Sequence, residues 1–341
     1  MRAVAIKDVK EFEIKNIEEP VADGNNVIIE ILKGGICGSD IHYWVDGVPK
    51  GLVMGHEFCG KVLDPGSRTD LKVGDRVTAL PISPCGECSA CDSGNVQYCR
   101  TTWKHAVGLS LDNPGCLTEK IKVRPDMVMK VADSVSDEEA SMVEPIAVSF
   151  HAIRLANIKV GDKVLIIGGG IIGLACAMFA KMEGASMVVL SETNEKRGEK
   201  SVKLNVADSW VDAKDENVIT NLITKSEGGF DHVIECCGNK PAVSTALMTV
   251  RPGGTIVLVG VATGEISIPT VLAVLGELTV KGAIAYTKEE FGTCLNLIKN
   301  KKIDVNKFID DVVGFDDVQK AYERLTSGND DAIKILVDPK K

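Results

Sequence analysis

The sequence predicts an α/β protein with two domains, a β-rich domain and a domain built on a doubly wound parallel sheet. Up to about residue 135, short apolar alternations are broken by Gly, Pro and Asp, which is typical of strands in a compact β-rich domain. From about residue 160 onward, apolar strands alternate with helical stretches, as in a parallel sheet covered by helices on both faces. The length of 341 residues suggests two domains or one large one, because single hydrophobic cores stop growing at about 250–300 residues.

The expected elements follow the same patterns in chain order. In the β-rich part, strands are expected at residues 26–32, 58–64, 74–80 and 117–123. A helix is expected over residues 137–158, because Ser136 is a suitable N-cap, acidic residues follow it, and apolar residues recur at helical spacing. Residues 162–192 then form a βαβ unit. The remaining expected elements are strands at 231–238, 255–260 and 277–284, helices at 289–302 and 315–328, and a last strand at 332–338.

The composition excludes several classes of protein. With 45% hydrophobic and 26% charged residues, the chain is typical of a globular protein and not of a disordered, fibrous or membrane protein. The net charge of −9 argues against nucleic acid and anionic membranes as partners. No secretory signal and no transmembrane run is found, so we expect a cytoplasmic protein. The odd count of 11 cysteines favours reduced thiols and metal ligands over a disulfide framework.

A glycine-rich turn lies inside the βαβ unit. The pattern G-x-G-x-x-G directly follows an apolar strand and opens a helix. Its glycines allow a tight turn, close approach of a pyrophosphate and helix–strand packing, and the helix N-terminus favours the anion. The alternative is an ordinary βαβ turn followed by a surface glutamate. The predicted residues of this dinucleotide site are Gly168, Gly170, Ile171, Ile172, Gly173, Glu192 and Arg197.

The acidic residue in this unit bears on the choice of dinucleotide. Glu192 lies 24 positions after Gly168, near the position where a carboxylate hydrogen-bonds the adenosine ribose. Because a carboxylate repels a 2′-phosphate, the sequence favours NAD over NADP. Arg197, five residues further on, could accept that phosphate and keeps NADP as the less favoured alternative.

Four cysteines lie within 15 residues, Cys85, Cys88, Cys91 and Cys99, with the spacing C-x2-C-x2-C-x7-C. Four thiolates on a loop suit a closed tetrahedral zinc site, whose role would be structural because no position is left for a substrate. An iron–sulfur cluster is the rival, but its usual C-P ending is missing, since Arg100 follows Cys99. Disulfides or unligated thiols are the remaining alternative.

Residues of the types that hold a catalytic zinc are also scattered along the chain. Cys37, His56, Glu57 and Glu144 could supply three protein ligands and leave one position open. Their spacing proves nothing by itself, because a cysteine after an apolar strand is often part of a core and a His-Glu pair is often an ordinary loop. From the residues alone, both interpretations stay open.

Motifs along the whole chain add to this evidence. They are GICGSDIHYW at 35–44, GHEFCGKV at 55–62, VGDRV at 73–77, the four-cysteine loop, VEPIAVSFHA at 143–152, GGGIIG at 168–173, DHVIECCG at 231–238 and GAIAY at 282–286. In their order and number, these motifs resemble the zinc-dependent medium-chain dehydrogenase superfamily, which includes the alcohol dehydrogenases. Within it, they resemble the sorbitol, threonine and butanediol dehydrogenase branch.

The resemblance implies roles for individual residues and two zinc ions per chain, one catalytic and one structural. Ser39 and His42 match the family's proton relay, and Asp40 matches a carboxylate that orients the zinc-binding histidine. Two glutamates share one ligand position, one bound directly and the other in exchange or through water. The implied ligands of the catalytic zinc are Cys37, His56, Glu57 and Glu144.

The resemblance also implies an activity and an architecture. The activity is hydride transfer between a secondary alcohol and NAD, with zinc as a Lewis acid on the hydroxyl. A GroES-like, zinc-containing catalytic domain is expected over residues 1–147 and 286–341, and a NAD-binding Rossmann domain over residues 148–285. The strand ELTVKGA at 277–283 resembles the edge through which relatives pair, so we expect a homodimer or homotetramer.

The predicted substrate pocket contains Tyr43, Trp103 and Tyr286. Where sorbitol dehydrogenases have an Arg-Tyr pair, this chain has Ala285 and Tyr286, which argues against sorbitol itself. The expected substrate is a polyol, vicinal diol or sugar-derived alcohol. Enzymes of the threonine 3-dehydrogenase or hydroxy-acid dehydrogenase type are alternatives. A zinc-free quinone or enone reductase would leave the predicted ligands unexplained. From a different class, the chain could be an NADH-binding redox sensor without turnover.

Overall fold

The computed structural model describes residues 1–262 and 264–341, which divide into two compact units. The first unit contains Met1–Ala147, Tyr286–Ser327 and Lys334–Lys341, and the second contains Val148–Ala285 and Gly328–Ile333. The sequence had assigned residues 328–333 to the first domain. They group with the second unit because Asn194 Nδ2 donates to the carbonyls of Gly328 and Asp330 at 3.0 and 2.9 Å.

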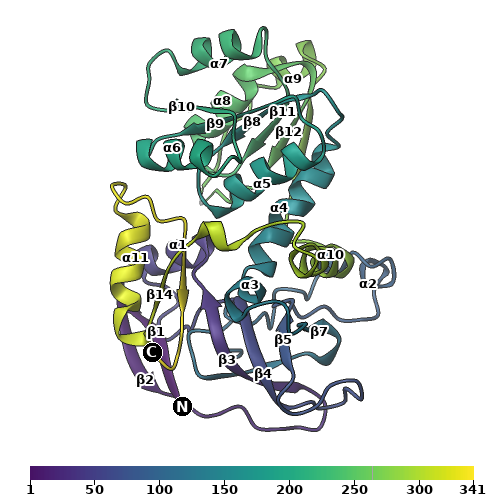
Figure 1. The fold of residues 1–341 in the computed structure, drawn as a ribbon, viewed down its shortest axis with the longest axis vertical. Coiled ribbons are helices and arrows are strands. Elements are labelled where there is room, and N and C mark those ends of the chain that lie inside the picture. Colours follow the sequence, from purple (N-terminus) through teal and green to yellow (C-terminus); the bar gives the residue numbers. More distant parts are fainter. Residues whose placement is uncertain (263) are drawn as a thin grey trace. The chain divides into compact units, whose positions relative to one another are not determined.

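The first unit is built around a sheet with the strand order β14-β15-β3-β4-β5-β7, and β6 pairs with β3 outside this order. A separate hairpin pairs β1 (Arg2–Asp8) with β2 (Glu11–Asn16). The strand β15 comes late in the chain and lies between β14 and β3, so the sheet joins late and early segments. The sheet strands are β3 (Val27–Gly35), β4 (Glu57–Asp64), β5 (Arg76–Ala79), β6 (Lys120–Val123), β7 (Val128–Lys130), β14 (Ile309–Val313) and β15 (Lys334–Val337) (Figure 1).

Short helices connect and flank these strands. The α-helices of the first unit are α1 (Gly38–Asp46), α2 (Ser89–Asp92), α3 (Asp137–Ser141), α10 (Lys288–Lys299) and α11 (Val318–Thr326), and α4 (Val143–Ala156) begins in it. The 3-10 turns are η1 (Val96–Tyr98), η2 (Pro125–Met127), η3 (Asn306–Phe308) and η4 (Phe315–Asp317).

The helix expected over residues 137–158 is two helices in the structure, α3 and α4. The predicted N-cap is present, because Ser136 Oγ accepts from the Glu139 N–H at 3.1 Å and Glu139 accepts from the Ser136 N–H at 2.9 Å. The prediction of one continuous helix was wrong because Pro145 has no N–H to donate to the carbonyl of Ser141. Proline is tolerated in the first turn of a helix, which is where α4 places it.

The second unit is a six-stranded parallel sheet with the order β10-β9-β8-β11-β12-β13. The chain runs outward from β8 in one direction and then from β11 in the other, which is the strand order of Rossmann-type doubly wound folds. The predicted fold class is therefore confirmed. The strands are β8 (Lys163–Ile167), β9 (Met187–Glu192), β10 (Ser209–Asp212), β11 (Phe230–Glu235), β12 (Val250–Leu258) and β13 (Thr279–Gly282).

Helices pack against this parallel sheet (Figure 1). The most buried is α5, in which nine of the twelve residues are buried, as expected for an apolar helix lying on a buried sheet. In α6, Gly198 is required by packing, because a Cβ there would lie 2.4 Å from the ring of Trp210. The helices are α5 (Ile171–Met182), α6 (Glu195–Lys203), α7 (Val218–Ser226), α8 (Lys240–Thr249) and α9 (Thr270–Leu275).

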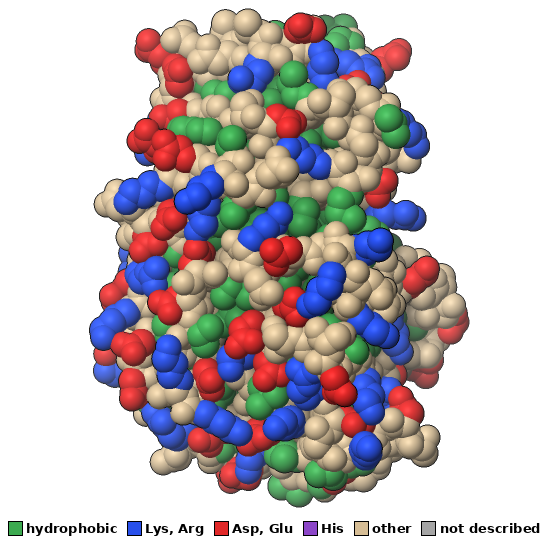
Figure 2. Space-filling model, in the orientation of Figure 1, with side chains coloured by type: hydrophobic (Ala, Val, Ile, Leu, Met, Phe, Trp, Pro, Cys, Tyr) green, Lys and Arg blue, Asp and Glu red, His purple; other side chains and the backbone are tan. Residues whose placement is uncertain are grey.

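The helix lengths and the charge on one face of the surface can be read from the structure. Among the described residues, no helix combines the length and the apolar character that crossing a membrane requires. On the face drawn in Figure 2, basic and acidic side chains are interspersed, so this face presents no extended field of one sign. A basic patch of the kind that binds nucleic acid is therefore not seen on this face.

Candidate metal and dinucleotide sites

Three predicted metal ligands meet at the ends of β3 and β4. Cys37 lies two residues after the end of β3, whereas His56 directly precedes β4 and Glu57 is the first residue of that strand. The two strands pair antiparallel with Gly35 opposite Glu57, which brings the two segments together. A Cβ on Gly35 would lie 2.0 Å from Glu57 Oε2, so only glycine fits there. The ligand atoms of Cys37, His56 and Glu57 all lie within 4.8 Å of one another, and His56 and Glu57 are buried.

The start of α1 holds the cysteine of this group. The Cys37 N–H donates to Asp40 Oδ2 at 3.2 Å, and Ser39 Oγ donates to Cys37 Sγ at 3.3 Å. Asp40 is fully buried, and its Oδ1 lies 3.5 Å from His56 Nδ1. Burial opposes a charge on His56, but the nearby Asp40 and Cys37 outweigh it and raise the pKa of the imidazole well above its ordinary value. The group therefore stabilises positive charge, as a cation site should.

The second predicted carboxylate lies beside this group. Tyr286, at the start of the late segment of the first unit, donates its hydroxyl to Glu144 Oε1 at 2.7 Å, and both side chains are buried. Burial raises the pKa of Glu144 to about 7, although the neighbouring His56 opposes that rise. Glu57, and not Glu144, belongs to the set of three whose ligand atoms converge.

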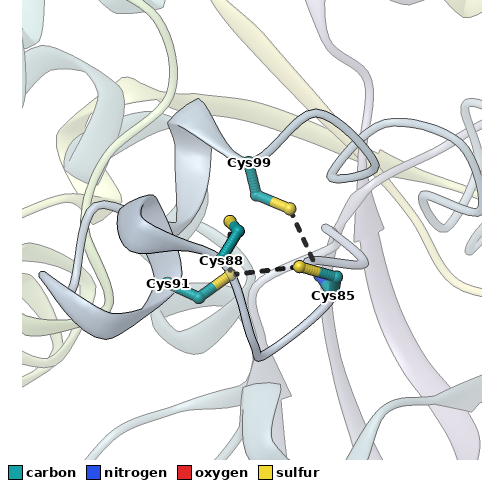
Figure 3. A group of neighbouring side chains, drawn as sticks. All are labelled: Cys85, Cys88, Cys91 and Cys99. Carbon is teal, nitrogen blue, oxygen red and sulfur yellow. Dashed lines mark hydrogen bonds between the residues drawn. The ribbon is translucent and has the colours of Figure 1, made fainter.

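The four cysteines of the loop converge as their spacing predicted (Figure 3). The sulfur atoms of Cys88 and Cys91 are 3.6 Å apart, and those of Cys85 and Cys91 are 3.9 Å apart. A tetrahedral zinc with bonds of about 2.3 Å requires sulfur atoms about 3.8 Å apart, so the donor set fits this metal. Hydrogen bonds from the Thr101 hydroxyl and the Cys85 N–H lower the pKa of the Cys99 thiol to about 6, which favours the thiolate.

The glycine turn of the second unit connects β8 to α5. Gly168 has a φ of 105°, which favours glycine, and a Cβ on Gly173 would lie 1.8 Å from the Gly168 carbonyl oxygen. A Cβ on Gly170, in contrast, would meet nothing within 4 Å. Gly170 is the N-cap of α5, and Ile171 and Ile172 begin the helix, so their N–H groups belong to its unpaired first turn. This turn has the form that binds a diphosphate.

The two residues predicted to contact the adenosine part are both engaged in hydrogen bonds. Glu192 is buried at the end of β9, where it accepts from the N–H groups of Gly169, Thr193 and Asn194. Its carboxylate is therefore held at the glycine turn. The Arg197 guanidinium donates to the carbonyl of Ala332 at 2.7 Å, so it is anchored to the returning segment 328–333.

Comparisons with known proteins agree with these two units. The alcohol dehydrogenase GroES-like domain family matches residues 23–133, and the zinc-binding dehydrogenase family matches residues 172–300. D-xylulose reductase A of Aspergillus niger is 32% identical over 339 residues, which cover 95% of this chain and 93% of the fungal protein. This chain belongs to the zinc-dependent medium-chain dehydrogenase family.

Solved structures of other dehydrogenases extend the comparison. The 2R,3R-butanediol dehydrogenase of Bacillus subtilis matches with a TM-score of 0.86 and 28% identity, covering 99% of each chain. A protein of Sinorhizobium meliloti, described as a zinc-binding dehydrogenase and solved with NADP, matches with a TM-score of 0.88 and 27% identity, also covering 99% of each chain. The family predicted from the motifs is confirmed.

The dehydrogenase has one buried charge that the sequence analysis missed. Lys334, in strand β15 between β14 and β3, donates to both carboxylate oxygens of Glu57 at 2.6 and 2.9 Å and to the Ile36 carbonyl at 2.7 Å. Both charged side chains are fully buried. Burial lowers the pKa of Lys334, but Glu57 and Cys37 outweigh burial and raise it. The sequence does contain a signal for this ion pair, which is a lysine inside the apolar run AIKILV. A lysine in a buried strand requires a partner of opposite charge.

The remaining predicted residues of the dehydrogenase differ in how far they are buried. His42 is exposed on α1, and Tyr43 beside it is half-buried. Trp103 lies on the loop after the four cysteines and is 40% exposed. Tyr286 is buried and hydrogen-bonded to Glu144, so its hydroxyl already has a partner. The contacts of Tyr43, Trp103 and Tyr286 with a substrate stay predictions.

Proposed function

We propose that this dehydrogenase transfers a hydride between a secondary alcohol and NAD, interconverting the alcohol and its ketone at a zinc ion. The observation that carries this proposal is the converging group of Cys37, His56 and Glu57, whose ligand atoms lie within 4.8 Å of one another. The proposed substrates are polyols, vicinal diols and sugar-derived alcohols. This choice is supported by the relatives, since one is a D-xylulose reductase and another a 2R,3R-butanediol dehydrogenase.

The residues of the first unit account for metal binding. Cys37 Sγ, one nitrogen of His56 and a carboxylate of Glu57 or Glu144 would hold zinc and leave one position for the substrate oxygen. When bound, zinc would supply the Lewis acidity that lowers the pKa of the substrate hydroxyl. Lys334 holds both oxygens of Glu57, at 2.6 and 2.9 Å, whereas Tyr286 donates only to Oε1 of Glu144, which favours Oε2 of Glu144 as the carboxylate oxygen that binds the metal.

The proton of the hydroxyl would leave along α1. Ser39 and His42 are three residues apart on this helix, so their side chains lie on the same face. The Ser39 hydroxyl lies 3.3 Å from Cys37 Sγ and is therefore beside the metal group. His42 is exposed, and its imidazole can exchange a proton with solvent. In this proposal, the Ser39 hydroxyl accepts the proton of the alcohol and gives up its own proton toward His42, whose imidazole releases a proton to water.

NAD is the proposed acceptor, although one structural relative was solved with NADP. The Glu192 carboxylate would accept hydrogen bonds from a ribose and would repel a 2′-phosphate. Arg197, which could attract that phosphate, donates to the carbonyl of Ala332 at 2.7 Å. The position of the Glu192 carboxylate and the hydrogen bond of Arg197 to Ala332 together favour NAD over NADP.

The four-cysteine loop is proposed to bind a second, structural zinc ion. All four positions around such an ion would be filled by Cys85, Cys88, Cys91 and Cys99, so no substrate could bind there. All 11 cysteines of the chain are free, which supports our placement of the protein in the reducing cytoplasm.

The edge strand β13 supports the proposed homo-oligomer. It ends the six-stranded sheet on one side, and its residue Val280 is 38% exposed. The neighbouring helix α9 exposes Val274 and Leu275 by 72% and 79%. An open apolar edge would be covered if two copies paired through β13. We expect the molar mass measured by light scattering to be that of a dimer or a tetramer.

The test of the function is a substrate screen with a matched variant. Reduction of NAD, and of NADP in parallel, is measured over sugar alcohols, vicinal diols, hydroxy acids and threonine, with zinc content determined on the same samples. We expect NADH formation with polyols or diols. For Cys37→Ser we expect a loss of kcat/KM of about a thousand-fold, since a Lewis acid supplies several kcal/mol. Cys294→Ala, in α10 and outside both metal groups, is the control and should stay active.

Three other results would contradict the proposal. Full activity of Cys37→Ser would exclude the metal mechanism. Reduction of a quinone or an enone by a protein without zinc in the Cys37 group would indicate a zinc-free reductase. Tight NADH binding with no turnover of any alcohol would indicate a redox sensor.

A further inference from the structure

Four buried polar atoms near the Cys37 group have no hydrogen-bond partner among the described residues. They are Asp40 Oδ1, Trp44 Nε1, His56 Nδ1 and the hydroxyl of Tyr322. The four residues are each at most 6% exposed. A buried polar group without a partner costs free energy, so such groups are nearly always paired with each other or with a buried water. Four of them in one place require an explanation.

Asp40 and Trp44 come from α1, His56 from the residue before β4, and Tyr322 from α11. Asp40 and Trp44 are four residues apart on α1 and so lie on one face of the helix. The rings of Trp44 and Tyr322 have centroids 5.6 Å apart, and Phe12 packs on Tyr322 at 4.8 Å. Tyr322 belongs to α11, which brings a hydroxyl from the late part of the chain to the buried side of α1.

Charge also links Tyr322 to the metal group. Burial raises the pKa of Tyr322, and Asp40 is the next largest cause of the rise, followed by Cys116 and Cys37. The Tyr322 ring packs on Trp44, one helical turn after Asp40, so the hydroxyl lies in the same buried region as the Asp40 carboxylate. Asp40 Oδ2 already accepts from the Cys37 N–H at 3.2 Å. Oδ1 is left for other donors, and a carboxylate oxygen can accept two hydrogen bonds.

We propose that Tyr322 is a positioning residue for the metal ligand His56. Its hydroxyl donates to Asp40 Oδ1 through one buried water. His56 Nδ1 lies 3.5 Å from Asp40 Oδ1, so a small shift would let Oδ1 also accept the Nδ1–H. Fixing the proton on Nδ1 leaves the lone pair of Nε2 for the metal. Trp44 Nε1–H is a second donor to the same buried carboxylate or water. This inference rests on the proposed zinc site of Cys37 and His56.

The test compares Tyr322→Phe with a packing control. Tyr322→Phe removes the hydroxyl and keeps the ring, whereas Phe12→Leu disturbs the same aromatic cluster and removes no donor. Zinc or Co²⁺ affinity is measured by competition with a chelator, and the Co²⁺ absorption spectrum reports on the ligands. For Tyr322→Phe we expect metal affinity at the Cys37 group to fall about 10- to 100-fold. The four-cysteine loop should keep its affinity and serves as the internal reference.

The possible results distinguish a failure of this inference from a failure of the proposed zinc-dependent function. If wild type binds a metal at the Cys37 group and Tyr322→Phe binds it equally well with the same spectrum, Tyr322 is only structural and the inference is overturned. An equal loss in Phe12→Leu would also overturn it, because packing would then explain the effect. If wild type binds metal only at the four-cysteine loop, the proposed function fails as well.

A measurement on wild type covers the case in which the variant does not fold. In a crystal structure of the metal-loaded protein, the Tyr322 hydroxyl should lie within hydrogen-bonding distance of Asp40 Oδ1 or of a water bound to it. A hydroxyl that contacts neither would refute the positioning role.

Discussion

The two candidate metal groups differ in how the chain builds them. The four-cysteine loop takes all its ligands from 15 consecutive residues, and three of its four cysteines are exposed or half-buried. The Cys37 group takes its ligands from the ends of β3 and β4 and its counter-charge from β15, and most of it is buried. Sequence spacing alone indicates the first kind of site, whereas the second exists only after the sheet has formed.

The difference predicts what holds each group in place. In the four-cysteine loop, the secondary structure consists of the four-residue helix α2 and the single turn η1, and the backbone hydrogen bonds of its cysteines are short-range ones, such as that from the Asp92 N–H to the Cys88 carbonyl at 2.9 Å. A metal would be its main cross-link. The Cys37 group is held by strand pairing and by the buried pair of Lys334 and Glu57. It should therefore keep its shape without metal.

The largest effect is expected from Lys334→Met. Removing this cation leaves the Glu57 carboxylate buried without its partner, and breaking a buried ion pair in this way costs about 3–5 kcal/mol. Denaturant unfolding of the first unit measures the loss. The double variant Lys334→Met with Glu57→Gln removes both charges and should recover part of the stability. A single variant as stable as wild type would show that the buried pair does not hold this group together.

A smaller and more local effect is expected from Cys88→Ser. Loss of one thiolate should release the loop zinc, and the stabilisation lost is about 2.7 kcal/mol when free zinc is a hundred times its Kd. Limited proteolysis should then cut the chain between residues 85 and 99 faster than in wild type, because the loop has little other support.

Cys37→Ser is the matched control for that measurement. It should lose the other zinc without any new cleavage site, because strand pairing supports Cys37. New cleavage near residue 37 in this variant would mean that both groups depend on metal for their shape, and the contrast between them would disappear.

The smallest effect is expected from Arg124→Met. Arg124 donates to the carbonyl of Pro84, directly before Cys85, and pairs with Asp126 at 3.0 Å. One hydrogen bond and a partly exposed ion pair together contribute about 1 kcal/mol. The expected result is a small fall in melting temperature with the loop zinc retained. Loss of that zinc would show that protein contacts, and not the metal, organise the loop.

Patterns of residues close together in the sequence predicted much of the fold but little of the Cys37 group. The glycine turn, the four-cysteine loop and the cap at Ser136 each depend on residues close together in the sequence, and the structure contains all three. Lys334 was missed because its partner is distant in the sequence. Lys334 binds Glu57 across 277 residues, and no periodicity or spacing connects them. The Cys37 group itself was assembled only through the family resemblance.

The position of β15 in the chain has a consequence for protein synthesis. The second unit takes most of its residues from the continuous segment Val148–Ala285, whereas the first unit needs both early and late segments. A chain translated only as far as residue 333 lacks the strand between β14 and β3 and the cation that pairs with Glu57. The unit that contains the N-terminus is therefore the last one to be completed on the ribosome.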